Sequence, residues 1–348
     1  MLRQQDVGHR IVVRRIVGIR EGRPLFSDAL GELVELNETH LTLTTAQGRI
    51  EVPMAEVHRA KRVPAARRPT AAAVAALELA ADEAWPAPTR ARLGEWLLRS
   101  ADGWTGRANS ALPIGDPDRP LAGAVDAVER WYASLGQPPR VNTPLPLAAP
   151  VGAELDTRGW TRGPTVLVQT VSLDRLTGAA ADGGAQTSPG RDAPAAGSDG
   201  RVGATEPTGR AGLPAVEIEL AAAPSAEWLS IAAGRKGGLP DAARHVLTAV
   251  DQVRFAHVYV DGRLVAAGRG TVTGTGRWLG LGLIEVLPGA RRQGLARRVV
   301  GVLAGWGTVA GATDAFLQVE QRNAPAVTLY RSLGFTTHHT YLTRSAPA

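Results

Sequence analysis

The strongest constraint on the fold is a short basic turn, residues 291–296, that separates two apolar segments of different periodicity. The preceding residues, 279–287, are mostly aliphatic and carry Glu285 as their only charge, and the pair Pro288-Gly289 then stops a strand. After the turn, apolar residues recur at the spacing of a half-buried helix: Leu295, Val299, Val302, Leu303 and Trp306. The pattern predicts a strand that enters a helix through a basic turn.

Such a turn favours the binding of an anion. The first N–H groups of a helix have no partner within the helix, and the helix dipole is positive at that end. Gly294 allows an anion to approach the backbone closely, and Arg291, Arg292 and Arg297 add positive charge. By itself, however, the turn also fits an ordinary arginine-rich start of a helix.

A second segment decides between these interpretations. Residues 315–319 have the composition of a strand, and the segment 323–335 that follows has the signals of a short helix. Asn323 is a favourable N-cap, Pro325 lies in the first turn, and Gly334 is a typical helix stop. The chain therefore contains two strand–helix units in succession.

These two motifs resemble those of the GCN5-related N-acetyltransferase (GNAT) family. The turn matches the family's acetyl-CoA pattern Gln/Arg-x-x-Gly-x-Gly/Ala, and residues 323–335 match its pattern Asn-x-x-Ala-x-x-Leu-Tyr-x-x-x-Gly-Phe. The resemblance covers residues 216–342. It implies an α+β fold with a mixed, splayed central sheet flanked by helices. Acetyl-CoA would bind where the strand ending at Val286 parts from the strand ending near Val319.

The resemblance also implies roles for individual residues. Backbone groups of Ile284, Glu285 and Val286 would bind the pantetheine arm. The pyrophosphate would lie on the turn and on the first residues of its helix: Arg291, Arg292, Gln293, Gly294, Leu295, Ala296 and Arg297. Asn323 and Ala326 would line the CoA side of the later helix, and no metal would take part.

Acetyl transfer to an amine needs an acid, a base and a donor for the oxyanion. By the resemblance, Tyr330 is the general acid beside the CoA sulfur; alternatively its ring is packed under the sheet and its hydroxyl is bonded to the backbone. A backbone N–H of residues 284–286 is the expected oxyanion donor. The base stays open between Glu285, Glu320 and a relayed water. Gln318 occupies a position where acetyltransferases of ribosomal-protein N-termini carry a glutamate.

Strand alternation decides where these candidate bases point. Glu285 should project to the face opposite Ile284 and Val286, because successive side chains of a strand alternate. Glu320 should share a face with Gln318 only if its strand stays regular. The sequence therefore does not choose between Glu285, Glu320 and a relayed water as the base.

Composition excludes several alternative chemistries. The 348-residue chain has no cysteine, which excludes disulfides, thiolate metal sites and a cysteinyl acyl-enzyme, so direct transfer is expected. His338-His339 has no acidic or cysteine partner at metal-ligand spacing, and His257 is expected to be a satisfied strand histidine. The start of the chain lacks the apolar core of a signal peptide, and no segment has the apolar length of a membrane span, so a cytoplasmic location is expected.

Residues 1–65 indicate a small all-β domain. Strands are expected at residues 10–17, 30–36, 40–45 and 49–53. The region resembles the SH3-like barrel that precedes the catalytic part in an actinobacterial subgroup of GNAT proteins, some of which carry a histone-acetyltransferase label. Residues 1–70 hold twelve Arg or Lys against eight Asp or Glu. A structural or docking role is expected, and this mild basic excess leaves binding of nucleic acid or of a protein tail as the alternative.

The rest of the chain divides by composition. Residues 70–175 resemble a degenerate GNAT half that has lost its phosphate turn, with a tryptophan-rich hairpin at 96–113 that belongs either to the core or to an acceptor pocket. Residues 178–212 are mostly small and polar, so they are expected to form a disordered linker that does not fix the geometry of the two halves. Residues 215–345 would form the catalytic GNAT domain.

Together these features predict an N-acetyltransferase that transfers the acetyl group of acetyl-CoA directly to a primary amine within a ternary complex. The amine is a protein lysine, a protein N-terminus or a small molecule, because the motifs concern only the donor. The alternative is an acetyl-CoA-binding regulatory or scaffolding protein with little turnover, which recruits a partner through the SH3-like barrel.

Overall fold

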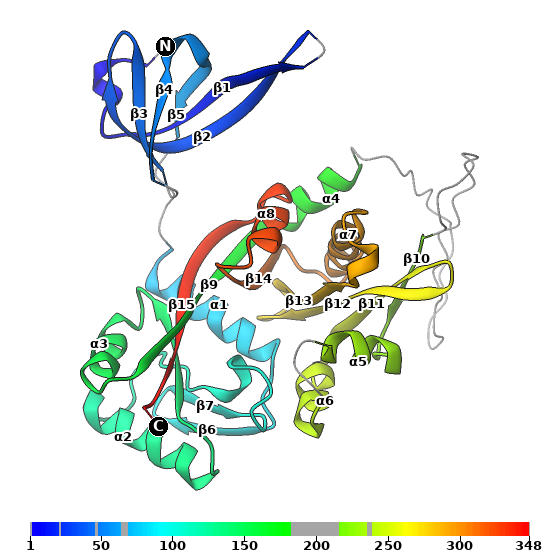
Figure 1. Cartoon of the computed structure of the whole chain (residues 1–348). Coiled ribbons are helices and arrows are strands. Elements are labelled where there is room, and N and C mark those ends of the chain that lie inside the picture. The colour runs from blue at the N-terminus through cyan, green and yellow to red at the C-terminus, as the bar shows by residue number, and fades with distance from the viewer. Residues whose placement is uncertain are drawn as a thin grey trace. The chain divides into compact units, whose positions relative to one another are not determined.

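The computed structural model describes residues 2–20, 22–45, 48–63, 69–181, 216–234 and 239–347. The chain divides into two units, Met1–Arg68 and Pro69–Ala348 (Figure 1). Most of the expected linker, residues 178–212, lies outside the described residues, but its first four residues belong to helix α4 (Leu173–Ala181). Within the described ranges, no helix is both long and apolar enough to cross a membrane.

The N-terminal unit is one antiparallel sheet with the strand order β4-β3-β2-β1-β5. Its elements are β1 (Arg10–Arg20), β2 (Arg23–Leu36), β3 (His40–Thr45), β4 (Gly48–Pro53), β5 (Val57–Arg62) and two 3₁₀ turns, Gln4–Asp6 and Met54–Glu56. The core of the sheet consists of apolar side chains that alternate along β1 to β4: Ile11, Val13, Leu33, Leu41, Leu43 and Val52. The four strands expected from this alternation are confirmed. The fifth, β5, was missed because its sequence is dominated by basic residues.

The strand order of this unit differs from a closed barrel. β4 and β5 lie at the two edges, and no pairing between them is found in the part of the chain that the structure describes. The sheet is therefore open, and the expected barrel is not closed. Its SH3-like character stays a prediction.

The second unit is built on an eight-stranded sheet in the order β10-β11-β12-β13-β14-β9-β15-β8. Its strands are β8 (Arg140–Leu145), β9 (Thr161–Ser172), β10 (Val216–Ala221), β11 (Val253–Val260), β12 (Arg263–Thr273), β13 (Trp278–Val286), β14 (Asp314–Glu320) and β15 (Thr336–Ser345). All neighbouring strands are antiparallel except β13 and β14, which are parallel. This arrangement confirms the predicted mixed sheet.

β9 joins the two segments that the sequence divides into separate halves. It belongs to residues 70–175, yet it lies between β14 and β15, so that Gln318, Val168 and His339 stand in register across three strands. Figure 1 shows β9 and β15 side by side. Strand pairing, and not the linker, therefore holds both segments in one sheet. The descent of residues 70–175 from a GNAT half stays a prediction.

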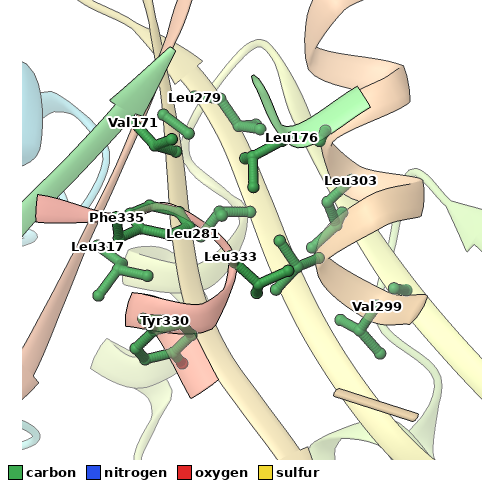
Figure 2. Close-up of a cluster of buried hydrophobic side chains, with 14 of the residues drawn as sticks. Val171, Leu176, Leu279, Leu281, Val299, Leu303, Leu317, Tyr330, Leu333 and Phe335 are labelled. Carbon is green, nitrogen blue, oxygen red and sulfur yellow. The ribbon is translucent and has the colours of Figure 1, made fainter. Parts of the chain in front are cut away.

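Helices cover both faces of this sheet. They are α1 (Ala71–Glu83), α2 (Leu121–Ser134), α3 (Ala149–Thr157), α4, α5 (Ala226–Ala233), α6 (Asp241–Thr248), α7 (Leu295–Val309) and α8 (Ala324–Ser332). α4, α7 and α8 enclose an apolar cluster with Leu281 and Leu317 of the sheet (Figure 2). α1 packs against Phe316 and Val168. Because Phe316 and Leu317 are consecutive in a strand, these two clusters lie on opposite faces.

The tryptophan-rich hairpin expected at residues 96–113 is present only in part. Leu97 and Leu112 form an antiparallel bridge, but the regular hairpin pairs β7 (Trp96–Ser100) with the preceding strand β6 (Thr89–Leu93). Gly94, with φ +55°, supplies the tight turn between them. Beyond β7 the chain forms a loop around Asn109, whose Oδ1 accepts hydrogen bonds from the N–H groups of Ala101 (2.8 Å) and Gly103 (2.9 Å). These side-chain contacts satisfy the backbone in place of a strand partner.

Candidate functional site

β13 and β14 run together over their first residues and then part. Their pairing extends from Trp278 and Asp314 to Leu281 and Leu317. Beyond that point β13 faces an opening instead of a neighbouring strand. The structure places residues 284–286, which were assigned to the pantetheine arm, at this opening.

A β-bulge shapes the same part of β13. Gly268 of β12 stands opposite two residues, Leu283 and Ile284, and Leu283 has φ +52°. A bulge bends its strand and re-aims the backbone groups next to it. Glycine is required at position 268 because a Cβ there would lie 2.3 Å from Val299 Cγ1 of α7. The close packing of α7 on the bulge therefore depends on this residue.

The basic turn leads from β13 into α7. Gly294 is the N-cap residue with φ +77°, and Arg292 also has a positive φ of 66°. Among the described residues, none accepts a hydrogen bond from the backbone N–H of Arg292, Gln293 or Gly294. The Arg291 Nε donates to the carbonyl oxygen of Val286 (3.0 Å) and ties the turn to the strand end. The N–H groups at the positive end of α7 suit an anion.

α8 lies against the start of α7. The Arg297 Nη2 donates to Ser332 Oγ of α8 (2.8 Å). The Asn323 side chain accepts a hydrogen bond from the N–H of Ala326 (3.4 Å), which confirms the predicted N-cap. Leu295 is buried and anchors the first turn of α7 in the apolar cluster. The residues assigned to the cofactor thus come from three adjoining elements.

Tyr330 lies on α8 at the edge of the apolar cluster (Figure 2). Its ring is 8% exposed and packs against Phe335, with 5.8 Å between the ring centroids. Burial, with a contribution from the charge of Glu285, raises the pKa of Tyr330 to about 12. The phenol is therefore protonated at neutral pH. The ring is packed as the alternative interpretation expected, but no described residue forms a hydrogen bond with its hydroxyl, so the role of Tyr330 as the acid stays a prediction.

A cavity of about 530 Å³ lies beside the opening. Gly282 of β13 and Gln318 of β14 line it where the two strands part, and Trp85 and Arg107 line it from α1's end and from the loop after β7. The tryptophans within residues 96–113 do not line it, because both are buried in apolar clusters. Sequence reasoning missed Trp85 and Arg107, since only the folded chain brings them together.

The side chains of β14 alternate regularly between the two faces of the sheet, which determines where its candidate base points. β14 pairs with β9 without a register shift, so Gln318 and Glu320 share a face, and both line the cavity. Glu320 also pairs with Arg322 (Nε to Oε2, 2.6 Å). Glu285 stands opposite Ala267 and projects away from the apolar cluster of α7, as predicted, but it does not line the cavity. Among the described residues that line the cavity, only Glu320 carries a carboxylate.

A buried polar network supports the cavity wall. Glu78 of α1 accepts a hydrogen bond from Arg107 Nη2 (3.0 Å) and lies 2.8 Å from His339 Nε2. His339 Nδ1 lies 2.8 Å from Nδ1 of His338. Burial opposes ionisation of Glu78, but Arg107 and His339 outweigh it and hold the pKa of Glu78 below its ordinary value. Glu78 and His339 are 261 positions apart, so sequence spacing did not reveal this acidic partner.

His257 is a satisfied core residue, as expected. It is 2% exposed, its Nδ1 donates to the carbonyl oxygen of Phe255 (3.1 Å), and the N–H of Ser225 donates to its Nε2 (3.3 Å). Burial lowers the pKa of His257. Within the described ranges, no group of three or more His, Asp or Glu side chains is arranged to hold a metal ion.

The chain is similar to proteins of known sequence. The family model described as "Probable histone acetyltransferase Rv0428c C-terminal" matches residues 71–343. The "Probable histone acetyltransferase Rv0428c" of Mycobacterium tuberculosis is 29% identical over 356 residues, which cover 97% of this chain and 95% of that protein. The "Uncharacterized N-acetyltransferase YobR" of Bacillus subtilis is 27% identical over 266 residues, with 75% and 93% covered.

A solved structure agrees on the fold. A "GCN5-related N-acetyltransferase from Kribbella flavida" superposes with a TM-score of 0.52 at 18% identity, and the match covers 81% of this chain and 97% of that chain. The family model spans almost all of the second unit, including both segments that share its sheet. The chain therefore belongs to the family of the probable histone acetyltransferase Rv0428c C-terminal region and is an N-acetyltransferase of the GNAT type.

Proposed function

We propose that this enzyme transfers the acetyl group of acetyl-CoA directly to a primary amine, with both substrates bound at once. The observation that carries the proposal is the anion-binding turn at the start of α7, next to the parting of β13 and β14. The turn binds the pyrophosphate through backbone N–H groups, and residues 284–286 bind the pantetheine arm in the opening. Asn323 and Ala326 border the cofactor from α8.

The chemistry follows from the groups around the opening. The neutral amine attacks the thioester carbonyl, and a backbone N–H of residues 284–286 stabilises the oxyanion. The carbon–sulfur bond then breaks, and Tyr330 protonates the leaving thiolate, since its pKa of about 12 keeps a proton on the phenol. Glu320, which lines the cavity, takes the proton of the amine directly or through water. Glu285 is the second candidate for this role.

Titration calorimetry of the full chain with acetyl-CoA tests the donor site. Gly294→Asp places a negative charge on the turn and should weaken binding of acetyl-CoA at least about tenfold, while the residue type tolerates the positive φ. Gly136→Asp makes the same change at another positive-φ glycine, beyond α2, and serves as the control.

The same protein is then assayed for CoA release with a panel of amines. Turnover supports the proposed reaction, and absence of acetyl-CoA binding refutes it. Tight binding without turnover across the panel would instead support the regulatory or scaffolding alternative. In that case the open sheet of the N-terminal unit becomes the surface to test for a protein or nucleic-acid partner.

A further inference from the structure

The cavity wall carries more positive than negative charge. Arg107, Arg140 and Arg269 line it, against the carboxylate of Glu320. Glu320 is itself paired with Arg322 at 2.6 Å. The described lining is therefore basic, and the electrostatic potential inside the cavity favours an anionic group.

Arg107 has a donor that no described residue satisfies. Its side chain is only 10% exposed, and its Nη2 donates to Glu78 at 3.0 Å. Its Nε, however, is buried without a partner in the described chain. A buried donor without an acceptor costs free energy, and an acceptor on a bound ligand would recover it.

Gln318 and Thr271 have further polar atoms of this kind. Gln318 Oε1 accepts a hydrogen bond from the Tyr341 hydroxyl (3.2 Å), which leaves the amide nitrogen, Nε2, buried without a described partner. Thr271 Oγ1 is buried in the same way, and both residues line the cavity. The guanidinium of Arg107 lies 6.0 Å from the Tyr341 ring centroid. The unsatisfied donors of Gln318 and Arg107 are therefore grouped around one tyrosine.

The other two cations have no carboxylate partner among the described residues. Arg269 is 2% exposed and donates to backbone carbonyls of α6 and of Ala84, with its guanidinium 5.2 Å from the ring centroid of Trp85. Burial lowers the pKa of Arg269 to about 9, which still leaves it charged at neutral pH. Arg140 is half-buried at the β8 end of the cavity. Buried positive charge of this kind is stabilised by an anion.

Resting on the acetyl transfer proposed above, we infer that the acceptor is a small amine that also carries a carboxylate. The carboxylate binds to the donors of Arg107 and Gln318 within the positive field of Arg140 and Arg269, and the amine lies toward Gly282, where the strands part. A cavity of about 530 Å³ has the size of a small-molecule site. A peptide rich in lysine and arginine is disfavoured, because its flanking cations meet like charges.

The test uses two ligands that resemble products and differ by one carboxylate, N-acetylphenylalanine and N-acetylphenethylamine. Both are titrated by calorimetry into the full chain, with and without CoA, beside a lysine-rich peptide. We expect the acidic ligand to bind at least about tenfold more tightly than the neutral one, as for a charge-assisted hydrogen bond. Equal or tighter binding of the neutral ligand or of the peptide, or no measurable binding of the acidic ligand, overturns the inference.

Variants locate the effect in the cavity. Gln318→Glu and Arg140→Glu should each remove most of the tenfold preference for the acidic ligand. Arg130→Glu makes the same charge change on the exposed face of α2 and should leave the preference intact. If all three variants keep the preference, the cavity is not its source and the inference is wrong. The titration with acetyl-CoA is an independent test. If acetyl-CoA does not bind while the protein still prefers the acidic ligand, acetyl-CoA is not the donor, but the inferred specificity of the cavity stands.

Discussion

Substitution of Tyr330 by phenylalanine tests the proposed acid most directly. The change removes one hydroxyl and keeps the ring against Phe335 in the apolar cluster. Because no described residue bonds to that hydroxyl, the free energy of unfolding should change by less than about 1 kcal/mol. Loss of a general acid slows turnover about 10²–10⁴-fold. This factor corresponds to about 3–5 kcal/mol of lost transition-state stabilisation.

Single-turnover measurement of CoA release separates chemistry from product release. The proposed contacts to acetyl-CoA are backbone groups, so its KM should stay within about twofold while kcat falls. The acid works only when protonated. Because the pKa of Tyr330 is about 12, deprotonation of this residue lowers the wild-type rate only as the pH rises toward that value.

Tyr132→Phe is the matched control. Tyr132 is also buried in the second unit, but its hydroxyl donates to the carbonyl oxygen of Arg99 (2.8 Å). That variant should lose about 1 kcal/mol of stability and keep its turnover. If Tyr330→Phe is stable and its kcat lies within about threefold of the wild type, Tyr330 is not the acid.

Three further predictions concern the bulge, the base and the buried network. Gly268→Ala puts a Cβ 2.3 Å from a valine of α7, so chemical denaturation should show that the free energy of unfolding falls by about 1–3 kcal/mol. An unchanged denaturation midpoint would contradict the close packing of α7 on the bulge. Glu320→Gln should lower kcat about 10²-fold or more and Glu285→Gln should lower it less, as measured by CoA release; the reverse order would exchange their roles. Glu78→Gln should cost about 3–5 kcal/mol at neutral pH, because it leaves Arg107 without its buried partner. Folding lowers the pKa of Glu78, so the stabilisation by its ionised carboxylate is fully present above the ordinary pKa of 4.5. This stabilisation is lost as the pH falls through the lower pKa of the folded state. The melting temperatures of variant and wild type should therefore converge in acid.

Local signals predicted the elements around the proposed donor site. The N-cap at Asn323, the left-handed Gly294 before α7 and the apolar spacing of α7 each depend on residues within a few positions of one another. A helix start is specified by its own capping residues and by the periodicity that follows. The elements around these residues therefore form where the sequence predicted them.

Elements without a distinct local pattern were placed less well. β5 has few apolar residues, because it pairs at the edge of its sheet. The loop after β7 is stabilised by the side chain of Asn109, which mimics backbone partners and leaves no periodicity to read. These errors have one cause. The contacts that stabilise these elements are made by neighbouring strands or by side chains, and the alternation of apolar and polar residues along the chain does not reveal them.

By itself the sequence determined the strand, turn and helix that we propose bind acetyl-CoA, because each is specified over a few consecutive residues. Only the tertiary structure decided which strand follows β14 in the sheet, and which carboxylate lines the cavity. β9 inserts there through pairing between residues about 150 positions apart, such as Gln318 and Val168. The cavity that we propose for the acceptor likewise forms from Trp85, Arg107 and Tyr341, whose meeting depends on long-range packing and not on any local pattern.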